Sequence, residues 1–176
     1  MDLSNREWWA ATHGMVLGGL FLLAFAGGFA GLYSLRPQLV TVEGIKERMT
    51  RLKVGVTGMA IVAWVTVITG SFIVYLWYRA VRVKGADITA YPKALLLSKA
   101  STAEWHNFGM EWKEHIAWLA PILAKVAAFM VIYYNRQLIV DKVLRRATMT
   151  VFVLAFASAA VAGLLGAFIT KAAPVH

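Results

Sequence analysis

The chain has 176 residues, of which 60% are hydrophobic and only 15% are charged, and its mean hydropathy is +0.64. So few charged residues cannot solvate a globule of this apolar content, which excludes an ordinary soluble domain and predicts an all-α integral membrane protein. The net charge of +9 does not indicate a nucleic-acid partner, because the basic residues cluster at the ends of apolar segments, where membrane topology and anionic headgroups explain them.

Four apolar segments are each long enough, at about 20 residues, to cross a hydrocarbon core of roughly 30 Å as helices. We place these spans at about 10–35, 54–78, 115–134 and 149–170, within a single membrane domain that covers 1–176. Backbone groups in lipid must form hydrogen bonds within their own segment, so helices are predicted even where β-branched residues are frequent. The predicted fold class is an antiparallel four-transmembrane-helix bundle.

The first span follows an interfacial pair of tryptophans, Trp8 and Trp9, and carries His13 close to its start. It is too long for a signal peptide and lacks a small-residue cleavage site, so we interpret it as a spanning helix. Gly14 and Gly18 have the small-xxx-small spacing that lets another backbone, or a flat cofactor, approach closely.

Charge in the connections predicts the orientation. The short connections, 36–53 and 135–147, hold nine Lys and Arg residues against three acidic residues, whereas the longer loop 79–114 holds six against four. The positive-inside rule therefore predicts that this loop and both termini lie outside the cytoplasm, and we expect a prokaryotic inner or plasma membrane. Within the loop, a short amphipathic surface helix is expected around 95–97.

The stretch 104–125 carries polar and ionisable side chains into a predicted helix. At about 100° per residue, one side of this helix bears Glu104, Glu111, Glu114, His115, Trp118, Ile122 and Lys125. The opposite side bears His106, Met110 and Lys113. A polar stripe that enters an apolar helix must face protein, pigment or water rather than lipid, so we expect the first side to carry the function.

The histidines suggest a haem. Four crossings place all four at one membrane face: His13, His106, His115 and His176. Cysteine is absent, so a metal or porphyrin must be held by His, Met or carboxylates. The first and third helices run in the same direction, so His13 and His115 are expected at similar depth, as a bis-histidine haem b requires. His106 is the substitute ligand if Gly109 breaks the helix and turns it inward, and His176 is expected to be solvated.

In the haem hypothesis, Gly14 and Gly18 leave room for the porphyrin edge, and Glu111 accepts the second N–H of His115. The alternative is that these histidines are interfacial polar residues without a ligand, and that the glycines serve helix packing. A di-iron site is not favoured, because the Glu-x-x-His spacing that such sites use is absent.

Lys125 lies about ten residues into the third span, close to the bilayer midplane. An ammonium group there costs several kcal/mol unless it is paired, neutral or hydrated. No other span holds an acidic residue, so the expected partner is water, a cofactor, another subunit or a carbonyl freed by Pro121. Pro121 is expected to kink the helix, because it cannot donate a hydrogen bond to Ala117.

Three hypotheses for function follow. The first is a single-haem cytochrome b that carries electrons between a quinone and an extracytoplasmic redox protein, within a larger respiratory or photosynthetic complex. In helix number and histidine placement, the chain resembles the small membrane cytochromes b that anchor respiratory enzymes. The second is a non-catalytic accessory subunit in which the histidines and Lys125 contact other membrane subunits or pigments. The third is a small transporter or proton-conducting subunit that uses Glu111, His115 and Lys125. We expect an electron-transfer or accessory subunit in the lipid bilayer rather than an enzyme on its own.

Overall fold

The structure is a computed structural model, and it describes residues 3–39, 41 and 43–174. This described part is 85% helical and contains no strand. Four of its helical runs are long and apolar enough to cross a bilayer: Asn5–Ser34, Gly44–Tyr78, Ala100–Tyr134 and Lys142–Ala172. These runs confirm the prediction of an all-helical chain with four candidate spans, and they extend beyond the predicted apolar cores because polar turns continue the helices.

The first two runs each contain one π-helical turn. The first run consists of α1 (Asn5–Ala11), the π-helical turn Thr12–Val16 and α2 (Leu17–Ser34). The second consists of α3 (Gly44–Thr69), the π-helical turn Gly70–Val74 and α4 (Tyr75–Tyr78). Ser4 starts the first run with a capping box, in which its hydroxyl accepts from the Glu7 amide and the Glu7 carboxylate accepts from the Ser4 amide.

The third run is interrupted twice. It consists of α6 (Ala100–Glu104), the π-helical turn Trp105–Met110, α7 (Glu111–Ile116) and α8 (Leu119–Tyr134). The break between α7 and α8 precedes Pro121, and there the Ala120 amide donates to the Ala117 carbonyl at 3.3 Å, one residue short of α-helical spacing. The predicted disturbance before Pro121 is therefore present. The fourth run, α10 (Lys142–Ala172), follows the single turn α9 (Gln137–Val140).

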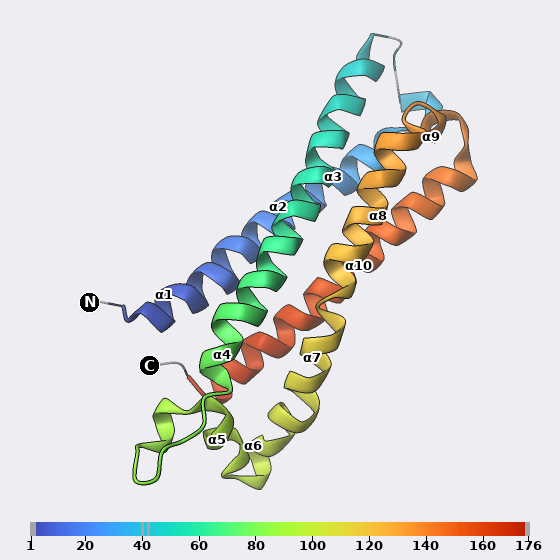
Figure 1. The fold of residues 1–176 in the computed structure, drawn as a ribbon. Coiled ribbons are helices and arrows are strands. Elements are labelled where there is room, and N and C mark those ends of the chain that lie inside the picture. The colour runs from blue at the N-terminus through green and yellow to red at the C-terminus, as the bar shows by residue number, and fades with distance from the viewer. Residues whose placement is uncertain (1–2, 40, 42, 175–176) are drawn as a thin grey trace.

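Consecutive runs point in opposite directions and pack together along their length (Figure 1). Helix α3 packs against α2 and α8, and α10 packs against the same two helices. The first and third runs therefore face each other across the bundle instead of lying side by side. We call the end that carries residues 79–99 the loop end; α5 (Pro92–Leu97) and α6 lie there, toward the same end as both chain termini (Figure 1).

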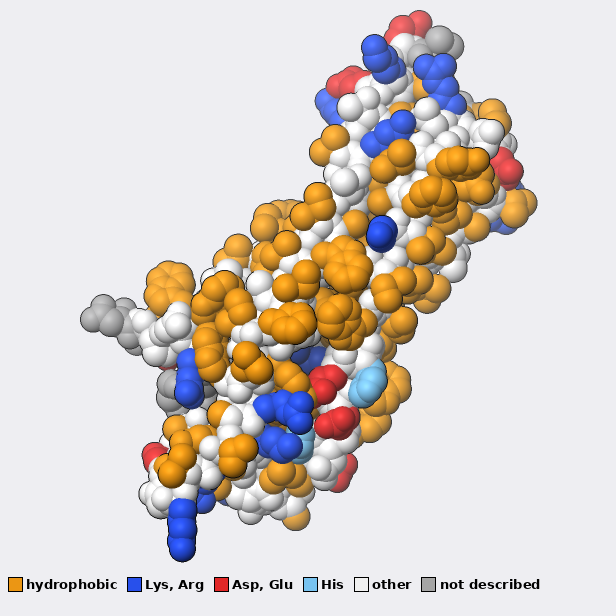
Figure 2. All heavy atoms as spheres, viewed as in Figure 1, with side chains coloured by type: hydrophobic (Ala, Val, Ile, Leu, Met, Phe, Trp, Pro, Cys, Tyr) orange, Lys and Arg blue, Asp and Glu red, His pale blue; other side chains and the backbone are white. Residues whose placement is uncertain are grey.

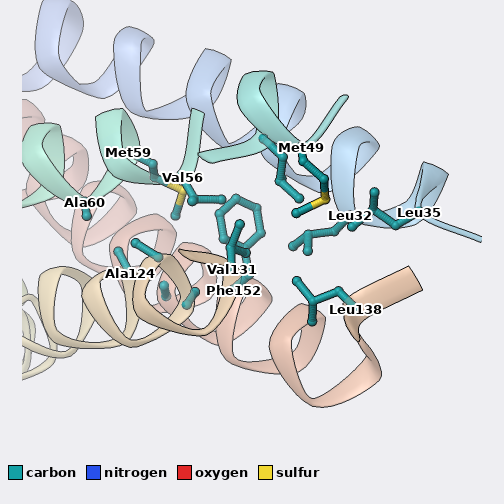
Figure 3. Packing of buried hydrophobic residues seen from close by; sticks show 14 of the residues in the cluster. Leu32, Leu35, Met49, Val56, Met59, Ala60, Ala124, Val131, Leu138 and Phe152 are labelled. Carbon is teal, nitrogen blue, oxygen red and sulfur yellow. The ribbon is translucent and has the colours of Figure 1, made fainter. Parts of the chain in front are cut away.

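The main apolar core lies between the four runs. Phe152 of α10 is 1% exposed, and its ring stacks on Phe25 with 5.3 Å between centroids. A Cβ on Gly28 would come within 2.6 Å of the Phe152 ring, so the missing side chain lets α2 and α10 approach closely. Figure 3 shows Phe152 beside apolar side chains of the neighbouring runs, among them Leu32, Met49, Val56 and Val131.

A second, smaller core closes the loop end. Leu96 of α5 is fully buried and packs with Tyr78, Met110 and Ile169. The predicted short helix around 95–97 therefore exists, and Leu96, together with Leu95, packs it against the bundle. Through these contacts α5 packs against the ends of the second, third and fourth runs.

The outer surface is apolar along the middle of the helices and charged toward the ends (Figure 2). Large apolar side chains are exposed there, including Leu23 at 73%, Phe72 at 65% and Phe129 at 58%. Apolar exposure of this extent is unfavourable in water and suits a lipid environment.

Candidate functional site

Polar side chains gather inside the bundle in its half nearest the loop end. Seven residues from the first three runs form this group, which we call the interior polar cluster: His13, Thr69, Tyr75, Tyr78, His106, Lys113 and Glu114. Each of the three π-helical turns lies next to it, since the turns contain His13, Gly70 and His106. A π-helical turn shifts the helical register by one residue and often marks a functional position.

His13 points from the first run at the second. Its Nδ1 lies 3.3 Å from Oγ1 of Thr69. The Thr69 hydroxyl donates its own proton to the Val65 carbonyl at 2.8 Å, which leaves its oxygen able to accept from His13 in the tautomer that carries Nδ1–H. A Cβ on Gly70 would lie 2.7 Å from Cε1 of the imidazole, so only glycine at this position admits the ring.

Lys113 approaches the cluster from α7. A Cβ on Gly166 of α10 would come within 3.0 Å of the lysine Cε, which shows how closely the lysine stem lies on that helix. The charge of Lys113 acts on the His13 imidazole and on the Glu114 carboxylate. No hydrogen bond or ion pair joins Lys113 to another residue within the described ranges.

Glu114 has a buried carboxylate oxygen that lacks a partner. Its Oε1 is shielded from solvent and forms no hydrogen bond with any residue that the structure describes. The carboxylate lies beside the Tyr75 hydroxyl and acts electrostatically on Tyr78 and His106. A buried acceptor without a donor costs about 1–3 kcal/mol, so a donor such as water, or the adjacent Tyr75 hydroxyl after a small rotation, would stabilise this oxygen.

His106 and Tyr78 form the part of the cluster nearest the loop. The Tyr78 hydroxyl and the His106 Nδ1 are hydrogen-bonded at 2.9 Å, and both side chains are buried, at 6% and 8% exposure. His106 and Gly109 belong to the same π-helical turn, which directs His106 into the bundle. His106 therefore lies inward although the helix continues through Gly109, whereas the sequence had suggested this position only for a helix broken there.

Most of the polar stripe predicted on the third run lies on the outer surface of this chain, and Glu114 is the one ionisable member that turns inward. Four of its ionisable members are exposed: Glu104, Glu111, His115 and Lys125. The Nδ1–H of His115 donates to the backbone carbonyl of Glu111 at 2.6 Å, so the carbonyl, and not the carboxylate, holds the ring. Acidic, basic and histidine side chains gather on the outer face near α4 and α7 (Figure 2). The inside of the bundle is instead met by the opposite face of the helix.

The other predicted site residues are not brought together. The imidazole of His13 packs on the second run, whereas His115 faces outward from the third. A Cβ at Gly14 or Gly18 would meet open space, so neither glycine accommodates another helix of this chain. Within the described ranges, no group of three or more His, Asp or Glu side chains is placed to hold a metal ion. His176 lies outside the described residues.

Lys113, Thr69, Tyr75 and Tyr78 were not predicted as members of the site, although the sequence contains a signal for Lys113. On the third run, small residues continue the face of Lys113 at helical spacing, and they are buried against the neighbouring helices: Ala120, Ala124, Ala127 and Ala128. Small residues mark the packed side of a membrane helix. This pattern identifies the inner face better than the number of polar residues does.

The fold and the cluster together define a class: an all-helical chain with four runs that suit a bilayer and with ionisable groups inside one half. Comparison with known protein families, with curated proteins and with solved structures found no match.

Proposed function

We propose that the chain is an integral membrane subunit whose interior polar cluster exchanges protons at the loop end, as part of a larger membrane complex. In this proposal the four runs cross the bilayer as an antiparallel bundle, and the loop end lies outside the cytoplasm, as the basic short connections predict. The proposal belongs to the same class as the proton-conducting hypothesis from the sequence. It keeps Glu114 of the predicted stripe, adds Lys113 from the opposite face, and leaves out Glu111, His115 and Lys125, which are exposed.

The buried Oε1 of Glu114 is the observation that carries the proposal. Ionisable groups inside a membrane bundle are expensive, and they commonly mark proton or ion pathways. Here the ammonium group of Lys113 lies within electrostatic range of both the Glu114 carboxylate and the His13 imidazole. A water molecule that donates to Glu114 would connect these groups to the loop end, where Tyr75 and Tyr78 flank the same carboxylate.

The half of the interior away from the loop end limits how far a proton can move through the bundle. Below Thr66 and Thr69, the described core between the runs is built from apolar side chains such as Ala63, Val56 and Phe152. The buried hydroxyls of this part, those of Thr148 and Ser158, each donate to a carbonyl of their own helix, and the described residues place no buried ionisable side chain between the cluster and Arg145 at the opposite end. The cluster therefore exchanges protons with one face only, and a partner subunit is needed for any net transport or redox coupling.

Water access to the cluster can be tested with introduced thiols, because the chain has no cysteine. We expect a membrane-impermeant methanethiosulfonate reagent to label His13→Cys and Glu114→Cys from the loop end and not from the opposite face. Ala63→Cys, at 3% exposure in the apolar core, is the matched control and should resist labelling from both faces. The proposal would be contradicted if the reagent labelled neither His13→Cys nor Glu114→Cys from the loop end.

Proton exchange itself can be tested by infrared spectroscopy of the reconstituted protein during steps of bulk pH. We expect a carboxyl band that disappears in Glu114→Gln and persists in Glu111→Gln, since Glu111 is the exposed carboxylate on the same helix. If no band that depends on Glu114 responds to bulk pH, the cluster does not exchange protons.

A cytochrome b is the second candidate, and the state of the histidines favours it. His115 uses Nδ1–H in a hydrogen bond, as His13 does in the tautomer that carries Nδ1–H, and this tautomer leaves Nε2 free to bind a metal. A bound haem b would supply one-electron chemistry between a quinone and a redox partner. As the helices stand here, the pair does not fit a haem held between the first and third runs, because one ring faces the second run and the other faces outward.

An optical spectrum of the purified protein with its native cofactors tests this candidate. A reduced-minus-oxidised α-band of the b type that is lost in His13→Ala and in His115→Ala would support it and would require α7 to turn. The absence of any such band would reject it and leave the proton-exchange proposal unaffected.

A further inference from the structure

Lys125 places an ammonium group on the apolar outer surface of the third run. It is exposed, and none of the residues that the structure describes forms a hydrogen bond or ion pair with it. About nine residues, or roughly 13 Å, separate it from Tyr134 at the end of the run. With a hydrocarbon half-thickness of about 15 Å, Lys125 lies close to the bilayer midplane.

Lys125 lines a shallow groove between α3 and α8. The groove has a volume of about 450 Å³, and its other lining groups are apolar apart from the hydroxyl of Thr57. Ala60 and Ala128, both 7% exposed, present only methyl groups to it, and Trp64 and Phe129 also line it. Small residues let the backbone of another helix approach closely, so the groove suits a helix rather than a bulky side chain.

An unpaired ammonium group at this depth costs several kcal/mol in lipid. Its stem is too short to reach the interface comfortably from the midplane. Within the third run, the nearest carboxylate is that of Glu114, about 11 residues or 16 Å earlier. On α3, Glu47 lies about 10 residues or 15 Å before Thr57. No described carboxylate of this chain therefore lies at the depth of Lys125.

A second copy of the chain does not solve this problem. A two-fold axis along the membrane normal keeps every residue at its own depth, and a two-fold axis in the membrane plane keeps the midplane in place. In either arrangement, the residue of the second copy at the depth of Lys125 is its own Lys125, and the carboxylates of both copies stay near the membrane surfaces. A carboxylate that pairs with Lys125 at this depth therefore belongs to a different polypeptide.

We infer that the groove between α3 and α8 is the docking site for a transmembrane helix of another subunit, and that this helix carries an Asp or Glu at the bilayer midplane. The partner carboxylate pairs with Lys125 while its neighbouring turns lie over Ala60 and Ala128. Desolvation in lipid makes such a pair specific for depth, because a carboxylate one or two turns away cannot reach the ammonium group. This inference does not depend on the proposed proton exchange.

The test uses a synthetic polyleucine helix with one central Asp, and a matched helix with Leu at that position. Association of each labelled helix with the reconstituted full-length protein is measured by energy transfer in phosphatidylcholine vesicles at neutral pH. We expect the Asp helix to bind at least ten-fold more tightly than the Leu helix. Lys125→Met should remove this preference, and Ala128→Leu should weaken binding by filling the groove. Lys171→Met, which changes a lysine at the end of α10, should leave the preference unchanged.

Two kinds of result would overturn the inference. One is the lack of an Asp preference that depends on Lys125: either the Asp and Leu helices bind the unmodified protein equally, or the preference survives Lys125→Met. The other is energy transfer between two differently labelled copies of the chain that Lys125→Met abolishes, because this would make a second copy the occupant. Lys125 is exposed, so its replacement by Met should not prevent folding, and near-ultraviolet circular dichroism of the variant checks this.

Discussion

Lys113 of α7 lies directly against Gly166 of α10, where a Cβ would come within 3.0 Å of the lysine Cε. A glycine on the fourth run therefore provides the space for a lysine of the third run inside the bundle. Without that space, the lysine stem could not pass α10 toward His13 and Glu114. The interior polar cluster thus depends on a residue that contributes no side chain to it.

Replacing Gly166 by leucine should displace Lys113. We expect Gly166→Leu to destabilise the protein by about 1–3 kcal/mol, the usual cost of overpacking. Gly163→Leu is the matched control, because a Cβ there would meet no atom within 4 Å, and we expect a change below about 0.5 kcal/mol. Unfolding by sodium dodecyl sulfate in mixed micelles measures both. Equal stability of the two variants would show that Lys113 does not occupy this space.

A methyl group at Gly70 should push His13 away from Thr69. A Cβ there would lie 2.7 Å from the imidazole, so Gly70→Ala should cost about 1–3 kcal/mol by overpacking. Gly58→Ala on the same run meets open space and is expected to be neutral or slightly stabilising. The NMR shifts of the His13 ring, which should move only in Gly70→Ala, provide a second measurement. Unchanged shifts in Gly70→Ala would contradict the contact.

The buried hydrogen bond between Tyr78 and His106 should contribute measurably to stability. Tyr78→Phe removes the hydroxyl and leaves Nδ1 of His106 without its partner, which is expected to cost about 1–3 kcal/mol. Tyr133→Phe is the control, because Tyr133 is 68% exposed, and its effect should stay within about 0.5 kcal/mol. Thermal unfolding in detergent distinguishes the two. A loss in Tyr133→Phe that equals the loss in Tyr78→Phe would argue against the bond.

At the opposite end of the bundle, Arg145 should stabilise the turn that precedes α10. It is 8% exposed and its guanidinium donates to the carbonyls of Leu138 and Ile139, each at 2.9 Å. Arg145→Met should cost about 1.5–3 kcal/mol, because these bonds involve a charged donor. The neighbouring Arg146 is exposed, and Arg146→Met should change little. If Arg146→Met destabilises the protein as much as Arg145→Met does, the hydrogen bonds of Arg145 do not stabilise the turn before α10.

The sequence by itself determined the long elements of this protein. Apolar length and the need of each backbone group for a partner within its own segment predict four helical runs, and the structure contains them. The missing amide of Pro121 predicts the break that separates α7 from α8. These features depend on local chemistry, so they can be read without knowing how the helices pack.

Only the tertiary structure decided which face of the third run lies inside. A helical projection gives the angles between His106, Lys113 and His115, but it does not say which side meets the other helices. That choice depends on Gly166 and Gly70, which belong to other runs and leave room for Lys113 and His13. It also depends on π-helical turns, each of which shifts the register by one residue and so rotates a side chain by about 100°. Packing between helices distant in sequence therefore turned Glu111, His115 and Lys125 of the predicted stripe outward and placed Lys113 and Glu114 in the interior polar cluster.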